Sequence, residues 1–95
     1  MPLPTVTDVY DARRRMGSRL FRTPLLPSAW LSSTSGGEAH LKVESLNLTN
    51  SFKIRGAFNA ALRLCEKHQS QPPMIVSASA GNHGRAMALV AEQLG

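Results

Sequence analysis

The sequence has 95 residues, enough for one small domain, and its 42% hydrophobic and 18% charged residues are typical of a folded protein rather than a disordered one. Its apolar runs are too short for a membrane-spanning helix, and its single cysteine excludes an internal disulfide and a cysteine-based zinc site. The net charge of +5 favours anionic partners in general, but with 5% aromatic residues and no recognisable module we expect no nucleic-acid binding.

The first part of the chain is predicted to hold two helices. Thr5 or Thr7 can cap a helix that runs to about Met16 and ends near Gly17. Two prolines in FRTPLLPSAWLSS then favour extended or turn geometry ahead of a short helix around residues 28–33. The start of the chain lacks the apolar stretch of a secretory signal, so we expect a cytoplasmic protein.

The middle of the chain is predicted to form a strand and then a long helix. AHLKVES alternates apolar and polar residues as a strand does, with Leu41 and Val43 on one face and Lys42 and Glu44 on the other. Ser51 is typical of a helix cap, and the helix should run from about residue 52 to 67. Cys65 is expected to be a small core residue of this helix. Its apolar stripe consists of Phe58, Ala61, Leu62 and Cys65.

HQSQPP is predicted to end that helix. Residues 74–77 are predicted to form a short strand of the buried type, and SAGNHG should lead from it into a final helix. The final helix has Ala86, Val90 and Leu94 on one apolar line. The alternation of helices and strands predicts an α/β layer fold with parallel strands. Because such a sheet normally continues further, we expect residues 1–95 to be the front part of a longer domain.

Lys53 is the first candidate for chemistry. It falls in the first turn of the long helix, where the positive end of the helix dipole disfavours a cation. With Phe52 and Ile54 beside it and Arg55 close by, its ammonium form should be destabilised, which would leave more of the free amine that a Schiff-base nucleophile needs. On spacing alone, a lysine that reaches water from a helix end is the better interpretation.

The second candidate is SASAGNHG, residues 77–84. Small residues between a strand and a helix leave backbone N–H groups free to face an anion, a carboxylate at least as well as a phosphate. A plain turn capped by Ser79 or Asn82 is the alternative. His83 could be a general base, although packing or capping is more usual beside glycines, and His40 and His68 are too scattered for a metal site or a triad.

The two candidates together decide between these interpretations. KVESLNLTNSFKIRGAFNAAL and IVSASAGNHGRAMALVAEQLG resemble the fold type II pyridoxal-phosphate enzymes, most closely their threonine/serine dehydratase and serine racemase branch. RRRMGSRLFRTPLLPSAWLS is similar to the N-terminal segment of that family, so the resemblance covers nearly all 95 residues. It implies part of a parallel-sheet, helix-flanked α/β architecture like that of tryptophan synthase β, with residues 1–95 forming the N-terminal part of the catalytic domain.

The resemblance also implies roles for individual residues. Lys53 corresponds to the lysine that forms a Schiff base with pyridoxal 5′-phosphate, Phe52 would pack on one face of the pyridine ring, and Asn82 would hydrogen-bond the 3′-oxygen of the cofactor. No metal is implied. The loop that receives the substrate carboxylate would contain Ser79, Gly81 and His83.

The implied activity is a lyase reaction of amino-acid metabolism. Lys53 would remove the α-proton of L-threonine or L-serine, the β-hydroxyl would leave, and hydrolysis would give a 2-oxo acid and ammonia. Serine racemases carry a serine where this chain has Ala80, which disfavours racemisation. Aspartate after the lysine and a threonine-containing asparagine loop, the pattern of cysteine synthases, are both absent from these motifs.

The family places its phosphate-binding loop, and the polar residue facing the pyridine nitrogen, downstream of SAGNHG. The 95 residues alone are therefore expected to be inactive, and the full-length protein to be a homo-oligomer. Three alternatives stay open at this point: a non-catalytic remnant of the family, a serine racemase-like enzyme, and a basic α/β module that binds an anionic partner.

Overall fold

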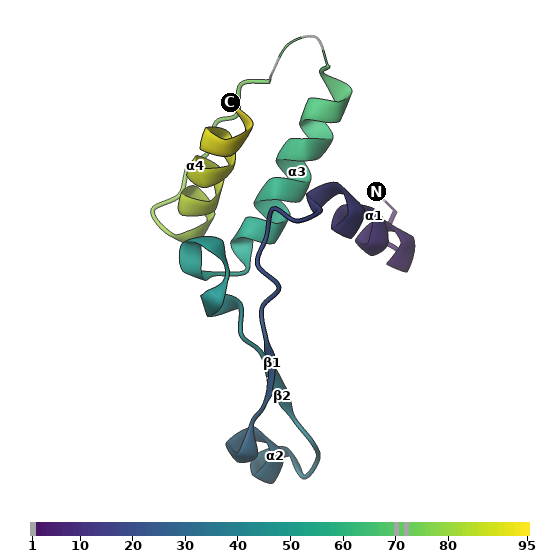
Figure 1. Ribbon diagram of the computed structural model, residues 1–95, viewed down its shortest axis with the longest axis vertical. Helices are drawn as coiled ribbons and strands as arrows, with labels where there is room; N and C mark the ends of the chain where they lie inside the picture. The colour runs from purple at the N-terminus through teal and green to yellow at the C-terminus, as the bar shows by residue number, and fades with distance from the viewer. Residues whose placement is uncertain (1, 70, 72) are drawn as a thin grey trace.

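The computed structural model describes residues 2–69, 71 and 73–95. Figure 1 shows a long helix, α3, beside a second one, α4, with an arm projecting from one end and α1 at the side. None of the helices in the described residues is long and apolar enough to cross a membrane. In chain order the elements are α1 (Val6–Met16), β1 (Leu25–Pro27), α2 (Ala29–Ser35), β2 (His40–Lys42), the 3-10 helices η1 (Glu44–Leu46) and η2 (Leu48–Asn50), α3 (Lys53–Lys67) and α4 (Asn82–Leu94).

Helix α1 begins and ends as its sequence predicts. Thr5 caps it by accepting a hydrogen bond from the backbone amide of Asp8, whose carboxylate in turn accepts one from the Thr5 amide. The backbone and side-chain hydrogen bonds of Thr5 lower the pKa of Asp8. Gly17 then ends the helix with a φ of 57°, a conformation that favours glycine.

The arm consists of β1, α2 and β2 (Figure 1). The two strands pair antiparallel, with Leu26 opposite Leu41, and no residue in either strand is buried. The sequence predicts a strand over residues 39–45, with Leu41 and Val43 on one face, but the strand covers only His40–Lys42 and Leu41 is 48% exposed. Its partner is a neighbouring segment that the sequence interpretation had left as extended chain, so the expected parallel pairing is not made within the described residues.

The core lies between α3 and α4. Phe58 is fully buried, and alanines on both helices let the two backbones approach closely. The predicted stripe of α3 is confirmed at Phe58 and Ala61, whereas Cys65 is only half-buried and is not the core residue that was expected. The buried set comprises Ile54, Ala57, Phe58, Ala61, Ala86 and Val90.

Residues 74–77 do not form the predicted strand. They run extended towards α4, but no described segment lies beside them to complete a hydrogen-bonded ladder. Met74 is 91% exposed and Val76 is 88% exposed, so their side chains are not buried either. The predicted break in HQSQPP agrees with the end of α3 at Lys67, while Ser70 and Pro72 lie outside the described residues.

Candidate functional site

Lys53 is the first residue of α3 and follows a tight reversal of the chain. Thr49 and Asn50 both have a φ of 58°, the left-handed region that non-glycine residues rarely adopt. The buried Ser51 then accepts a hydrogen bond from the Lys53 backbone amide at 3.3 Å. The hydroxyl of Ser51 therefore does serve the start of the helix, although Phe52 occupies the position directly before the first helical residue.

The side chain of Lys53 lies over its aromatic neighbour. Its Nζ is 5.3 Å from the centroid of the Phe52 ring, which is cation–π distance. Phe52 is 60% exposed, so its ring is not part of the core and one face stays accessible to a flat ligand. Within the described residues no carboxylate pairs with the Lys53 amine, which leaves this amine available for chemistry.

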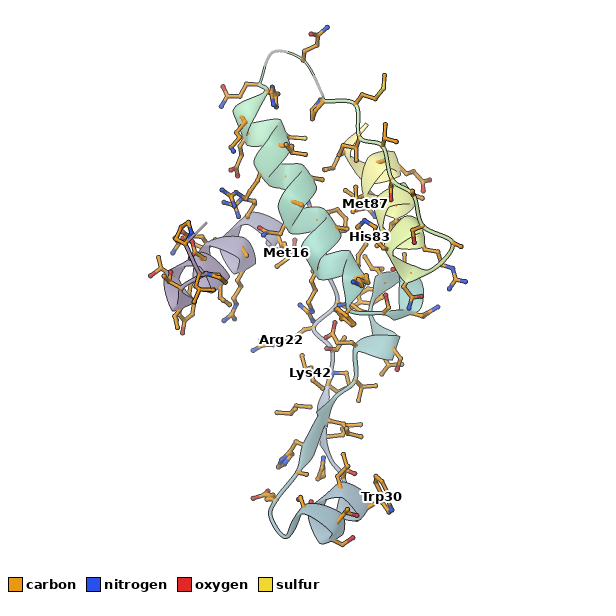
Figure 2. The ribbon with its side chains drawn as sticks, turned by 180° about the vertical axis from the view of Figure 1, so that it is seen from behind. Met16, Arg22, Trp30, Lys42, His83 and Met87 are labelled. Carbon is orange, nitrogen blue, oxygen red and sulfur yellow. The ribbon has the colours of Figure 1, made fainter. Side chains whose placement is uncertain are left out.

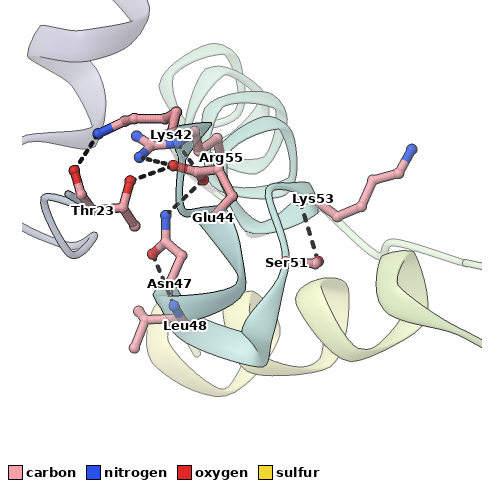
Figure 3. Close-up of polar contacts among 8 residues, drawn as sticks. All are labelled: Thr23, Lys42, Glu44, Asn47, Leu48, Ser51, Lys53 and Arg55. Carbon is pink, nitrogen blue, oxygen red and sulfur yellow. Dashed lines mark hydrogen bonds and ion pairs between the residues drawn. The ribbon is translucent and has the colours of Figure 1, made fainter. Parts of the chain in front are cut away.

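Arg55, which the sequence placed near Lys53 as a second cation, is turned away from it and bound by Glu44 (Figure 3). The two make a bidentate pair, with Nη2 to Oε1 at 2.7 Å and Nε to Oε2 at 2.8 Å. The hydrogen bonds from Arg55 are the largest cause of a lowered Glu44 pKa of about 2, and the same pairing raises the pKa of Arg55. The charge of Arg55 is thus compensated.

Glu44 was not among the predicted site residues, because the sequence pattern puts it with Lys42 on the polar face of a strand. The structure instead makes it the first residue of η1, turned towards α3. A signal was present: Glu44 and Arg55 have opposite charges and lie on either side of the segment that carries Lys53. Opposite charges on either side of a turn do not by themselves specify pairing, since most such charges face water.

The SAGNHG loop forms the start of α4. Ser79 Oγ accepts a hydrogen bond from the Gly81 amide at 3.2 Å, and neither Ser79 nor Asn82 caps the helix through its side chain. The amides of the first helical turn have no partner within the helix and are therefore available to an anion. Ser79, Asn82 and His83 are exposed, and Gly81 is half-buried.

Gly84 lies very close to the backbone of this loop. A Cβ at Gly84 would lie 2.8 Å from the carbonyl oxygen of Ser79, a distance that real Cβ atoms do not reach. At Gly81 an added Cβ would meet nothing within 4 Å. The absence of a side chain at Gly84 therefore allows the Ser79 carbonyl to lie close to α4.

The two candidate segments lie at one end of the helix pair. Helices α3 and α4 run side by side with their N-terminal ends on the same side, and α4 also contacts η2 (Figure 1). Phe52 and Lys53 at the start of α3, and the residues from Ser79 to His83 at the start of α4, consequently share this end. The positive ends of both helix dipoles point there, which favours an anionic ligand.

Hollows on the surface of the described residues include one at each of two places. One of about 360 Å³ lies beside α4 and includes Ser79, Gly84 and Met87 in its lining. His83 and Met87 lie along the same side of α4 in Figure 2. Another, of about 1260 Å³, lies between α1 and α3, and no predicted site residue lines it. We place the candidate site at the helix starts, because both candidate segments lie there and neither contributes a residue to the larger hollow.

A family model described as pyridoxal-phosphate dependent enzyme matches residues 18–95, most of the chain. The chain belongs to this family. The matched residues include the six predicted site residues, and pyridoxal phosphate is the cofactor by which the family is defined.

Known members of the family resemble the chain over nearly all of its length. The L-threonine ammonia-lyase of Thermotoga maritima is 43% identical over 91 residues, which are 96% of this chain and 22% of that protein. A pyridoxal 5′-phosphate-dependent aspartate racemase superposes with a TM-score of 0.85 at 35% identity, covering 99% of this chain and 30% of that one. The serine racemase of Dictyostelium discoideum gives a TM-score of 0.80 at 35% identity, covering 94% of this chain and 29% of that one.

These likenesses confirm the predicted fold class: the chain adopts part of the α/β architecture of fold type II pyridoxal-phosphate enzymes. The chain spans less than a third of the length of each of these proteins.

The described residues fit the cofactor in three respects. The Lys53 amine is uncommitted and accessible to an aldehyde, and the exposed Phe52 ring beside it offers a surface for a pyridine ring. Asn82 is exposed at the first residue of α4 and carries an amide that can donate a hydrogen bond to an oxygen.

Proposed function

We propose that this chain supplies the cofactor-binding lysine of a pyridoxal-phosphate-dependent ammonia-lyase that acts on L-threonine or L-serine. The observation that carries the proposal is the Lys53 amine, uncommitted above an exposed aromatic ring at the start of α3. The identity to the Thermotoga maritima L-threonine ammonia-lyase supports the choice of reaction.

In this proposal Lys53 has two tasks. Its amine holds the cofactor, and once the substrate has taken its place the same amine removes the proton from the α-carbon. When bound, pyridoxal phosphate supplies an electron-withdrawing ring that stabilises the charge left on that carbon. Phe52 covers one face of the ring, and the Asn82 amide donates to the 3′-oxygen.

The start of α4 holds the substrate carboxylate. The Ser79 hydroxyl and the His83 amide donate hydrogen bonds to it, and the Gly81 amide exchanges its bond to Ser79 Oγ for one to the carboxylate, with the positive end of the helix dipole behind them. With the carboxylate fixed, the β-hydroxyl leaves as water and takes up one proton, which balances the proton that Lys53 removed from the α-carbon. Addition of a second water and release of ammonia then yield the 2-oxo acid, so the net reaction consumes no oxidant.

We further propose that residues 1–95 are the N-terminal part of a larger catalytic domain, in a cytoplasmic homo-oligomer, with the phosphate-binding elements in other residues. The chain covers only 22% of the Thermotoga maritima enzyme and 30% of the aspartate racemase, which supports a larger domain. On its own the chain should be inactive, because the cofactor phosphate would have no cradle.

A racemase is the second candidate, since the chain superposes well on an aspartate racemase and a serine racemase. Racemisation needs a proton donor on the opposite face of the cofactor from Lys53. Ala80, which directly precedes Gly81, has only a methyl group at the position where the resemblance puts a serine in serine racemases. We therefore favour elimination.

A chimera tests the proposal. Residues 1–95 replace the matching segment of the Thermotoga maritima enzyme, and release of ammonia and 2-oxo acid is measured with L-threonine and L-serine. We expect both products, and a loss of at least about 100-fold in Lys53→Ala, as removal of a catalytic base typically causes. The matched control is Lys67→Ala, at the other end of α3, which should keep the activity.

Two results would contradict the proposal. A folded chimera that retains its activity in Lys53→Ala would show that the lysine is not used. A chimera that forms the D-amino acid faster than the 2-oxo acid would favour the racemase instead.

A further inference from the structure

A cluster of polar side chains sits on the far side of α3 from the Lys53 amine (Figure 3). Its centre is Glu44, whose two carboxylate oxygens accept four hydrogen bonds. Arg55 donates two of them, at 2.7 and 2.8 Å, the Thr23 hydroxyl donates one at 2.6 Å, and the Asn47 amide donates one at 3.1 Å. Thr23 is 4% exposed and Asn47 is 2% exposed.

This cluster is more than a surface ion pair. The carboxylate side chain is 18% exposed, and the contact with Arg55 has the bidentate geometry that gives the strongest hydrogen bonds between side chains. Exposed pairs of charges contribute little because water competes for both partners. Here the donors come from separate segments of the chain, so loss of the carboxylate would release several contacts together.

Residues of the cluster lie at both ends of the turn that carries Lys53. Asn47 Oδ1 accepts a hydrogen bond from the Leu48 amide at 2.8 Å, so the residue that binds Glu44 also fixes the entry to the turn. Thr49 and Asn50 follow in left-handed conformations, which cost energy and persist only where the surroundings hold them. Arg55 stands two residues after Lys53, so Glu44 also fixes the exit.

The same contacts determine which cation faces the candidate site. Arg55 lies within one turn of Lys53 on α3, yet its guanidinium points to Glu44 while the Lys53 amine points the other way (Figure 3). Without the carboxylate, the guanidinium would be free to approach the same ligand as the amine. Because Glu44 holds the guanidinium of Arg55, the Lys53 amine is the cation of this pair that faces the candidate site.

We propose that Glu44 and Arg55 are a positioning pair: neither touches the reacting atoms, but together they hold the turn from Asn47 to Lys53 in the conformation that presents the Lys53 amine. The use of this amine for the cofactor rests on the proposed function. The effect of the pair on the conformation of the turn does not depend on the proposed function, and it can be measured separately.

The test uses the chimera described above, in which residues 1–95 replace the matching segment of the Thermotoga maritima enzyme, with Glu44→Gln, Arg55→Gln and the two combined. The first readout is hydrogen exchange at the amides of Leu48, Asn50 and Lys53, which donate hydrogen bonds within the turn. The second is the ratio of borohydride-trapped pyridoxal phosphate on Lys53 to that on Lys67 of the same helix. Circular dichroism checks that each variant remains folded.

The control is Arg15→Gln. Arg15 also ties another segment to α3, through Asn59 at 2.7 Å and Glu66 at 3.2 Å, and its side chain is 19% exposed. This control breaks a comparable interhelical contact that lies away from the turn. A change caused only by general loss of stability would appear in this variant as well.

We expect each single variant of the pair to speed exchange in the turn about tenfold or more, the usual effect of losing a hydrogen bond to a charged group. The Lys53 to Lys67 ratio should fall severalfold in both, the double variant should resemble either single one, and Arg15→Gln should leave both readouts unchanged. Unchanged exchange in Glu44→Gln, or an equal response in Arg15→Gln, would overturn the positioning pair.

The two proposals fail in different ways. If Lys53 in the unaltered chimera is trapped no more than Lys67, while exchange still responds to Glu44→Gln alone, the proposed function loses its support and the pair stands. If Lys53 is trapped preferentially and Glu44→Gln changes neither readout, the lysine keeps its role and the pair does not exist.

Discussion

Gly84 shows how a single residue can set the shape of the candidate site. Its Cα hydrogen faces the Ser79 carbonyl so closely that a methyl group would come within 2.8 Å of the oxygen. Gly56 is also helical, in α3, but an added Cβ there would meet nothing within 4 Å. The two glycines therefore offer the same substitution in two helices with different surroundings.

We predict opposite effects for alanine at these two positions. Gly56→Ala should raise the free energy of unfolding by about 0.5–1 kcal/mol, because alanine loses less backbone entropy in a helix. Gly84→Ala should lower it by about 1–3 kcal/mol, because the clash forces Ser79 or α4 to shift. Urea unfolding followed by circular dichroism measures both. A stabilising Gly84→Ala would contradict the close approach to Ser79.

Single residues also show what the sequence could and could not predict. The importance of Lys53 was recognised because SFKIRGA and SAGNHG occur together, and the family match covers both motifs. The roles assigned to Phe52, Asn82 and the loop residues stay predictions. The exposure of Phe52 was not predictable, since an aromatic residue beside a helix is usually buried, and only the tertiary fold decides which face it takes.

Among the elements, helices followed the sequence better than strands. The boundaries of α1 come from a local capping box, and those of α3 from a local apolar period, so both could be predicted. Strand β1 was missed and residues 74–77 were wrongly assigned, because a strand exists only where a partner pairs with it. For the same reason Glu44 was misplaced on a strand face.

The contact of η1 with α3 predicts a pH dependence of stability. Glu44 has an ordinary pKa of 4.5 and a pKa of about 2 in the folded chain, so the folded state binds fewer protons in this range. Its contribution is full above about pH 4.5 and is lost as the pH falls from there through about 2. Glu44→Gln should therefore lower the free energy of unfolding by about 1.5–3 kcal/mol at pH 7 and by much less near pH 3.

Urea unfolding at the two pH values gives this difference directly. Glu66→Gln is the control, because Glu66 is also paired with an arginine but its side chain is 60% exposed. An exposed pair should contribute less than about 1 kcal/mol at either pH. A cost of Glu44→Gln that does not change between pH 7 and pH 3 would show that the Glu44 charge does not hold η1 to α3.

At the scale of the whole molecule, the arrangement of α3 and α4 makes the site possible. The two helices pack through Phe58 and a set of alanines, and they bring two motifs that are far apart in the sequence to one end (Figure 1). No local signal in the sequence specifies that arrangement. It was predictable only through the resemblance to the family, which the family match and the solved structures bear out.

The central claim is that Lys53 is the lysine that binds pyridoxal phosphate. It is tested most directly by adding the cofactor to the chimera, reducing with borohydride, and locating the modified lysine by peptide mass spectrometry. We predict that the pyridoxyl group is found on Lys53, with Lys42 and Lys67 serving as internal references in the same peptide map. A cofactor adduct spread evenly over the three lysines, or absent from Lys53, would contradict the claim.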